Sequence, residues 1–198
     1  MPTARTGRVR VAVLISGAGS NMAALVDAAG ESDAPYEVVL VLSNKAEAGG
    51  LTVAEAKGVP TAIVDHAAFG KDRAAHEQAI QTVLEAHHVE VVALAGYMRL
   101  LTPFLVGRWA GRMLNIHPSL LPKYPGLDTH ARAIAAGDAE AGCTVHLVTE
   151  GVDDGPVLGQ AVVPVQPDDT PAALAQRVLA AEHQLYPQAL ARFCRTPD

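Results

Sequence analysis

The sequence predicts an α/β fold: a mostly parallel, twisted sheet flanked by helices, with an antiparallel strand pair and a long helix at the C-terminal end. In the first half of the chain, short apolar runs rich in β-branched residues alternate with helical segments, an order typical of right-handed β-α-β crossovers. In the second half, two apolar runs are separated only by the acidic turn EGVDDG, which favours a hairpin. We expect residues 1–198 to form a single domain, with residues 1–7 flexible.

The first half of the chain supplies the parallel strands. Each predicted strand is a nearly continuous apolar run, the pattern of a strand buried on both faces. Between them, the longest helical segment is amphipathic and has Ile80, Val83 and Leu84 on one side. The predicted strands are 9–16, 36–44, 60–65 and 89–97, and the predicted helices are 22–29, 51–57 and 72–88.

A glycine-containing loop, GAGSN at 17–21, joins the first strand to the first helix. Gly17 and Gly19 permit a tight turn, and Ser20 or Asn21 can cap the helix. Exposed amides and the helix dipole favour an anion at such a point. The loop is neither a dinucleotide fingerprint nor a Walker loop. It is therefore either a phosphate site or a plain tight turn.

The second half of the chain begins with a short helix for which Thr102 is the cap and Pro103 the first residue. A short strand near 113–117 leads into an irregular loop that is rich in proline. A long C-terminal helix, capped by Thr170, closes the chain. The remaining predicted elements are a helix at 129–136, strands at 143–149 and 156–165, and the last helix at 171–193.

Two polar side chains interrupt the strand that ends before Pro118. Alternation puts Asn115 and His117 on one face of this strand, and leaving either unpaired in an apolar sheet costs roughly 1–3 kcal/mol. They either bond to nearby backbone or face a cleft beyond the strand ends, where both could donate to a negative oxygen in acyl transfer. Asp153 in the acidic turn is the natural partner that keeps the imidazole charged, and the neighbouring Asp154 is the alternative.

Composition narrows the classes of partner. The formal net charge of −6 and the pI near 5.7 argue against a nucleic-acid-binding surface. No apolar run approaches the roughly 20 residues of a membrane span. Cys143 and Cys194 lie far apart without metal-ligand spacing, which fits a reducing compartment. We expect a cytoplasmic protein, monomeric or homodimeric, that binds small molecules but no metal, nucleic acid or membrane.

Three blocks of the sequence resemble the phosphoribosylglycinamide formyltransferase family, folate-dependent transformylases of purine biosynthesis. They are LISGAGSNMAAL at 14–25, LAGYMRLLTPFLV at 94–106, and LNIHPSLLPKYPGLDTH at 114–130 with GCTVHLVTEGVDDGPVLGQ at 142–160. NIHPSLLP and the later VDxGP are shared with methionyl-tRNA formyltransferase and formyltetrahydrofolate hydrolase. SGxGSN, SNK and KYPG point to the glycinamide ribonucleotide enzyme.

The resemblance implies a Rossmann-like formyltransferase fold and an enzyme that transfers a formyl group from 10-formyltetrahydrofolate, its co-substrate, to the amine of 5′-phosphoribosylglycinamide. Asp128 and Asp154 depart from the family pattern, in which a histidine and a glycine are common. The implied site residues are Asn115, His117 and Asp153 for catalysis, Gly19, Ser20, Asn21 and Glu182 for the ribonucleotide, and Arg73, Met98, Arg99, Leu100, Leu101, Asn115, Val148 and Val152 for the folate.

Two other functions fit parts of the same pattern. A hydrolase would use the same three catalytic side chains to send the formyl group to water, and would release formate without an amine substrate. A non-catalytic nucleotide or folate binding module would bind ligand through residues 19–21 and tolerate substitution of Asn115 and Asp153.

Overall fold

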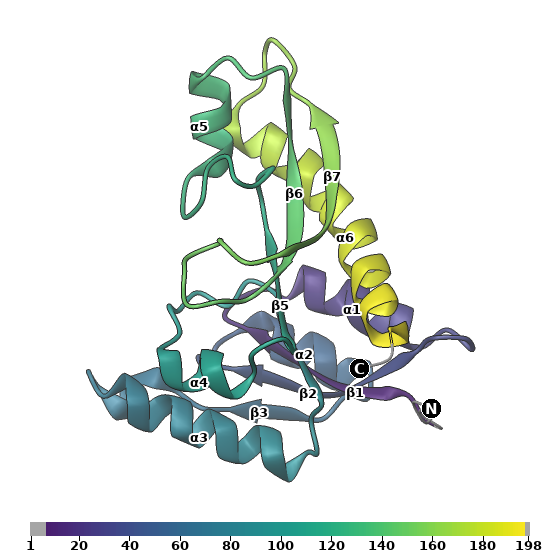
Figure 1. Ribbon diagram of the computed structural model, residues 1–198, viewed down its shortest axis with the longest axis vertical. Coiled ribbons are helices and arrows are strands. Elements are labelled where there is room, and N and C mark those ends of the chain that lie inside the picture. Colours follow the sequence, from purple (N-terminus) through teal and green to yellow (C-terminus); the bar gives the residue numbers. More distant parts are fainter. Residues whose placement is uncertain (1–6, 197–198) are drawn as a thin grey trace.

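The fold is a twisted sheet with helices on both faces, described for residues 7–196 by a computed structural model (Figure 1). Of the residues 1–7 expected to be flexible, all but Gly7 lie outside this range. The strands are β1 (Val9–Ile15), β2 (Tyr36–Ser43), β3 (Thr61–Ile63), β4 (Val91–Leu94), β5 (Met113–His117), β6 (Glu140–Leu147) and β7 (Val157–Pro164). The helices are α1 (Ser20–Ala29), α2 (Gly49–Ala56), the 3₁₀ helix η1 (His66–Phe69), α3 (Arg73–Ala86), α4 (Pro103–Arg108), α5 (Thr129–Ala135) and α6 (Pro171–Arg195).

The seven strands lie in the order β3-β2-β1-β4-β5-β6-β7. Strands β1 to β5 pair in parallel with one another, whereas β6 runs antiparallel to β5, and β7 antiparallel to β6. The mostly parallel sheet and the C-terminal antiparallel pair are thus confirmed. The direction of chain progression reverses between β1 and β4. A crevice beyond the carboxyl ends of the strands is expected at such a reversal, because the connections leave to opposite faces.

The two faces of the sheet carry separate hydrophobic cores. Helices α1, α2 and α6 contribute to the first core, for example through Leu25, Leu51 and Tyr186. Helix α3 and the segment around α4 contribute to the second, through Ile80 and Trp109. Strands with apolar side chains on both faces are required in such a three-layer arrangement, which explains why every residue of β1 except Arg10 is apolar.

The start of α1 differs from the prediction. Gly19 occupies the cap position with φ of 74°, and Ser20 is already the first helical residue, so neither Ser20 nor Asn21 caps the helix. The left-handed turn at Gly19 directs the chain into the helix without a side-chain cap. The amides at this end consequently receive no side-chain hydrogen bond from the cap residue.

Other element ends differ in smaller ways. Thr102 stands at the cap of α4, but its hydroxyl donates to Glu77 instead of accepting from the helix. Thr170 caps α6 as expected, accepting from the Ala173 amide. Strand β4 ends before Gly96, whose φ of 73° turns the chain out of the sheet.

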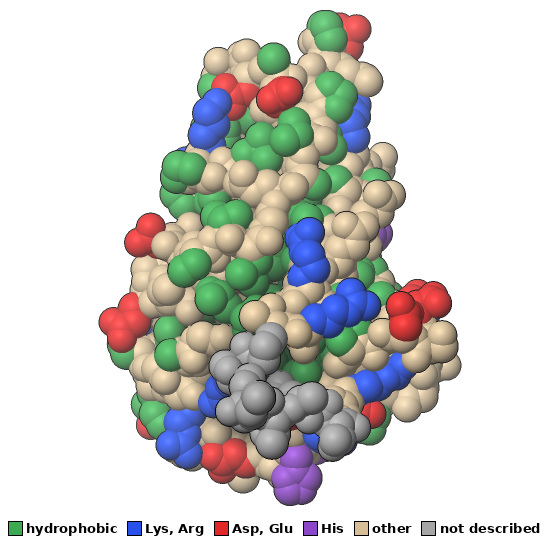
Figure 2. Space-filling model, turned by 45° about the vertical axis from the view of Figure 1, so that its right-hand side comes forward, with side chains coloured by type: hydrophobic (Ala, Val, Ile, Leu, Met, Phe, Trp, Pro, Cys, Tyr) green, Lys and Arg blue, Asp and Glu red, His purple; other side chains and the backbone are tan. Residues whose placement is uncertain are grey.

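Charged side chains of both signs are interspersed on the face seen in Figure 2. The described atoms of this face present no continuous positive surface of the kind that phosphate backbones require. Within residues 7–196, no helix is long and apolar enough to cross a membrane.

Candidate active site

The candidate site lies at the end of β5, where Asn115, His117 and Asp153 come together. Asp153 lies in the β6–β7 loop, and its Oδ2 is 3.2 Å from Nδ1 of His117. The His117 side chain is 6% exposed and that of Asp153 12%, so water screens this ion pair little. Asn115 sits two residues before His117 on the same face of the strand.

The second ring nitrogen of His117 is also engaged. Nε2 lies 2.9 Å from the carbonyl oxygen of Tyr124, so both nitrogens face acceptors. Only the doubly protonated imidazolium donates to both. The geometry therefore favours a positively charged ring at the end of β5.

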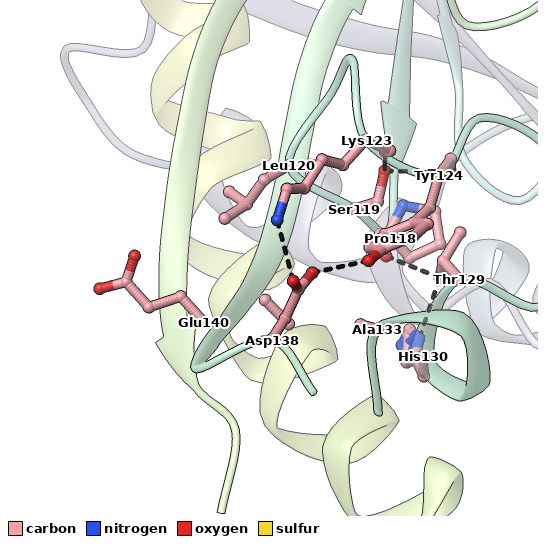
Figure 3. A pocket seen from close by; sticks show the side chains of 11 residues that line it. Pro118, Ser119, Leu120, Lys123, Tyr124, Thr129, His130, Ala133, Asp138 and Glu140 are labelled. Atoms are coloured by element: carbon pink, nitrogen blue, oxygen red, sulfur yellow. Dashed lines mark hydrogen bonds and ion pairs between the residues drawn. The ribbon is translucent and has the colours of Figure 1, made fainter. Parts of the chain in front are cut away.

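Hydrogen bonds and an ion pair hold the loop that presents the Tyr124 carbonyl, as Figure 3 shows. The Tyr124 hydroxyl donates to one Asp138 oxygen at 2.8 Å, and Lys123 Nζ lies 2.9 Å from the other. Ser119 donates to the carbonyl of Lys123 at 2.6 Å. The residues drawn in Figure 3 line a pocket on the far side of this loop, and their contacts keep the partner of His117 Nε2 in place.

His146 is the residue that sequence reasoning missed. It pairs directly with Asn115 across the antiparallel β5–β6 ladder, and its Nε2 lies 3.2 Å from the Asn115 amide nitrogen. Its Nδ1 is 2.9 Å from the Leu147 carbonyl, so we assign the hydrogen of the neutral ring to Nδ1 and the accepting lone pair to Nε2. The alternation of Thr144 and His146 within an apolar run, which mirrors Asn115 and His117, was the available signal.

Asp153 is held as a carboxylate. Its partial burial alone would raise the pKa, but the hydrogen bond from the Gly126 amide and the charge of His117 bring the pKa of Asp153 below its ordinary value. The Gly126 amide donates to Oδ2 at 2.9 Å, and His146 Nε2 lies 3.6 Å from Oδ1. The backbone at Asp153 is left-handed, with φ of 53°, which turns its side chain toward His117.

Asp154 is exposed, whereas Asp153 Oδ2 lies 3.2 Å from Nδ1 of His117, so Asp153 rather than its neighbour is the ion-pair partner. Asp128, the other departure from the family pattern, stands at the cap position of α5 with φ of 56° and is exposed. Its carboxylate makes no capping hydrogen bond. Both acids therefore add negative charge to the protein surface rather than to the buried ion pair.

The second part of the site surrounds the start of α1. The Asn21 amide nitrogen donates to Oε2 of Glu182 at 2.7 Å, which ties the loop to α6. Glu182 is 6% exposed, and its burial raises the pKa even though the Asn21 hydrogen bond lowers it. The Asn21 Oδ1 atom is buried and has no hydrogen-bond partner. Gly19, Ser20, Asn21 and Glu182 are thus brought together.

The third part is the segment after β4, which is partly apolar and exposed. Met98 and Leu100 are 69% and 65% exposed, and Val152 in the Asp153 loop is 54% exposed. Leu101 and Val148 pack against the second core. Large apolar side chains left exposed near polar groups are typical of a ligand-binding surface. Arg99 is half-buried, and its charge acts on the Tyr97 hydroxyl.

Arg73 lies beside this segment, because its guanidinium donates to the Leu100 carbonyl. The segment is also tied to the glycine loop, since the Met98 amide donates to Ser16 Oγ at 2.8 Å, directly before Gly17. All three parts of the site therefore lie along the carboxyl ends of β1, β4 and β5, which are neighbours in the sheet.

A doubly wound sheet with an open helix start after β1 and an Asn–His–Asp cluster at the end of β5 defines an α/β enzyme equipped for acyl-group transfer. A family described as "Formyl transferase" matches residues 9–190. The chain belongs to this formyl transferase family.

Relatives with known names agree with this assignment. The chain is 45% identical over 178 residues to the phosphoribosylglycinamide formyltransferase of Haemophilus influenzae, covering 90% of this chain and 84% of that protein. It is 48% identical over 183 residues to the trifunctional purine biosynthetic protein adenosine-3 of Bos taurus, covering 92% of this chain. It spans only 18% of that longer relative.

A solved structure is similar throughout. The crystal structure of phosphoribosylglycinamide formyltransferase from Brucella melitensis matches with a TM-score of 0.91 and 53% sequence identity, covering 96% of this chain and 98% of that one. The described part of the chain contains no group of three or more His, Cys, Asp or Glu side chains that could hold a metal ion.

Proposed function

We propose that this protein transfers the formyl group of 10-formyltetrahydrofolate to the amine of 5′-phosphoribosylglycinamide, as an enzyme of de novo purine biosynthesis. The observation that carries the proposal is the His117–Asp153 pair beside Asn115, between an open helix start and an apolar surface. The formyl transferase family and the names of the relatives support the same reaction.

In the proposed reaction the amine attacks the formyl carbon, and negative charge develops on the formyl oxygen. Asn115 has one amide hydrogen bound to His146 and a second left to donate to that oxygen. His117 stabilises the same charge through its positive ring, because both of its N–H groups are already committed. The bond between the formyl carbon and the folate nitrogen then breaks, and the proton that the amine loses balances the one that the folate nitrogen gains. A water ordered by Asp153 relays this proton, or His117 donates one after it exchanges one of these hydrogen bonds and is recharged by the proton from the amine.

Positioning supplies the rest of the proposed catalysis, since no covalent enzyme intermediate is needed. We assign the ribonucleotide phosphate to the amides of residues 19–21, and the ribose hydroxyls to Glu182 and the unpaired Oδ1 of Asn21. We assign the folate to the surface formed by Arg73, residues 98–101, Val148 and Val152. Holding both substrates in register turns a bimolecular encounter into an oriented one.

The test supplies purified protein with 10-formyltetrahydrofolate, with and without the ribonucleotide, and follows both tetrahydrofolate and formate. Tetrahydrofolate formation that requires the ribonucleotide and yields no formate is expected. Formate release without the ribonucleotide would instead identify a hydrolase. Binding of either ligand without turnover would identify a non-catalytic module.

The cysteines, the proposed substrates and the location of the site residues support a compartment, a class of partner and an oligomeric state for this protein. Cys143 and Cys194 are not joined by a disulfide in the described part of the chain, which supports a reducing cytoplasm. Both proposed substrates are small molecules, so neither nucleic acid nor a membrane is needed. A monomer or a homodimer would serve equally, because every residue assigned to the site lies in one chain.

A further inference from the structure

Helix α2 is fastened to the glycine loop through its own first residues. The backbone N–H of Gly50 donates to the Gly17 carbonyl at 3.0 Å, so the start of α2 and the loop at 17–21 share a hydrogen bond. Gly49 and Gly50 are consecutive in sequence but differ in surroundings: Gly50 is buried and Gly49 is exposed.

The two backbones approach so closely that neither side has room for a side chain. A Cβ on Gly50 would lie 3.0 Å from the Gly19 Cα, 3.1 Å from the Gly17 oxygen and 2.6 Å from Cδ1 of Ile15. A Cβ on Gly19 would lie 2.8 Å from the Gly50 Cα. A Cβ on Gly49 would have no heavy atom within 4 Å.

Helix formation gives no reason for glycine at position 50. Glycine is a poor helix former, and its φ there is not in the left-handed region that favours glycine. The requirement comes from space alone, and the atoms that define it belong to the loop at 17–21 and to the residue before Ser16.

We propose that Gly50 is a positioning residue for the ribonucleotide phosphate: it sets the distance between α2 and the loop, and so the place of the amides at residues 19–21. This inference rests on the proposed function, which assigns the phosphate to that loop. A methyl group at position 50 displaces backbone atoms of Gly17 and Gly19, which can move only together with the amides that follow them. The three atoms nearest to a Cβ at position 50 belong neither to the surface around Met98 nor to the His117–Asp153 pair, so we expect the substitution to affect both less than it affects the loop.

The test compares Gly50→Ala with the matched control Gly49→Ala, in the full chain, by steady-state kinetics and by calorimetric titration with the ribonucleotide and with inorganic phosphate. Gly50→Ala is expected to raise the KM and Kd for the ribonucleotide at least tenfold, with the KM for the formyl donor changed less than twofold. Gly49→Ala is expected to behave as the wild type. A purely structural role would change both KM values or lower the fraction of active enzyme.

Ile15→Val with Gly50→Ala guards against simple misfolding, because it removes the Cδ1 atom that lies nearest the new methyl group. This double variant is expected to recover the wild-type Tm but not the ribonucleotide affinity. Unchanged ribonucleotide KM and Kd in a folded Gly50→Ala protein would overturn the inference alone. A wild-type protein without measurable ribonucleotide affinity would overturn both the inference and the proposed function.

Discussion

In the proposed reaction His117 acts through its charge more than through a free N–H group. His117→Asn keeps a polar group that can reach Asp153 but removes the positive charge from the end of β5. We expect kcat to fall by about 10²–10⁴-fold, the usual range for losing a general acid or base, while both KM values change little. Steady-state kinetics with each substrate varied in turn measures this.

The control is the same substitution at His130, a histidine that lies behind the loop and bonds to Thr129 rather than to the charged pair. His130→Asn is expected to keep a wild-type kcat. A His117→Asn protein with a kcat within twofold of wild type would show that the imidazolium is not used.

In the proposed reaction His146 acts through Asn115, and we expect its contribution to be separable from that of His117. His146→Ala removes the acceptor that holds the Asn115 amide, and we expect roughly a tenfold loss of kcat, the cost of about one hydrogen bond to a polar partner. His146→Gln places an oxygen near the former Nε2 and should restore most of that loss. If Ala and Gln give equal rates, the side chain at 146 does not orient Asn115.

Among the site residues, the sequence predicted those whose role can be inferred from the local pattern of polar and apolar side chains. Asn115 and His117 stand out because polar side chains share one face of an apolar strand. The choice of Asp153 over Asp154 needed the left-handed backbone at 153, which no local pattern encodes. The partnership of Asn115 with His146 needed the strand register, which brings together residues 31 positions apart.

Among the elements, α3 holds the segment after β4 through a ladder of side chains spaced four residues apart. Arg73 binds the Leu100 carbonyl, and Glu77 accepts from both the amide and the hydroxyl of Thr102, at 2.7 and 2.5 Å. Further along the same face, Gln81 accepts from the Trp109 indole at 2.8 Å. One face of one helix therefore holds the chain at Leu100, Thr102 and Trp109, at the end of and just after the segment proposed to bind folate.

Glu77→Ala tests this ladder, because Glu77 is 3% exposed and its loss leaves two donors of Thr102 without their acceptor. We expect the KM for the formyl donor to rise about tenfold, equivalent to about 1.4 kcal/mol, with the ribonucleotide KM unchanged. Gln78→Ala, one residue away on the exposed side, is the control. Equal effects on both substrates would contradict a local role for α3.

Helices and strands were predictable where one period runs through the whole segment, as in β1, β2 and α6. The ends of helices and strands could not be predicted, because they depend on the backbone conformation of single residues such as Gly19 and Gly96. The 3₁₀ helix η1 was missed since four residues are too few to show a period.

In the molecule as a whole, the strand order brings together residues that lie far apart in the sequence. Asn21 and Glu182 are 161 positions apart and form one hydrogen bond, because α6 returns across the sheet to the start of α1. The sequence implied Glu182 only through a family resemblance. The free-energy cost of burying the Glu182 carboxylate can be recognised only in the fold, where the last helix places this side chain against the first helix.

The substitution Glu182→Gln measures how much the buried, ionised carboxylate destabilises the fold. Burial raises the pKa of Glu182 in the folded state, so the stability that this group contributes is present below the unfolded-state pKa of about 4.3 and is lost as the pH rises through the folded-state pKa. Glutamine keeps an oxygen that accepts from Asn21 but never ionises. We therefore expect Glu182→Gln to melt at a higher temperature than wild type at pH 8, with the difference vanishing near pH 4.

A gain of about 1 kcal/mol in a chain of this length raises Tm by roughly 2–4 °C, and we expect a change of that order. Calorimetry across pH 4–8 measures it, with Glu140→Gln on the exposed start of β6 as a control that should show no such trend.

The same Glu182→Gln protein should bind the ribonucleotide more weakly, because a carboxylate accepts hydroxyl hydrogens more strongly than an amide does. Stability gained at alkaline pH together with affinity lost would mean that the protein keeps a buried charge for its substrate. A pH-independent difference in Tm would mean that water reaches Glu182, and that the carboxylate costs the fold nothing.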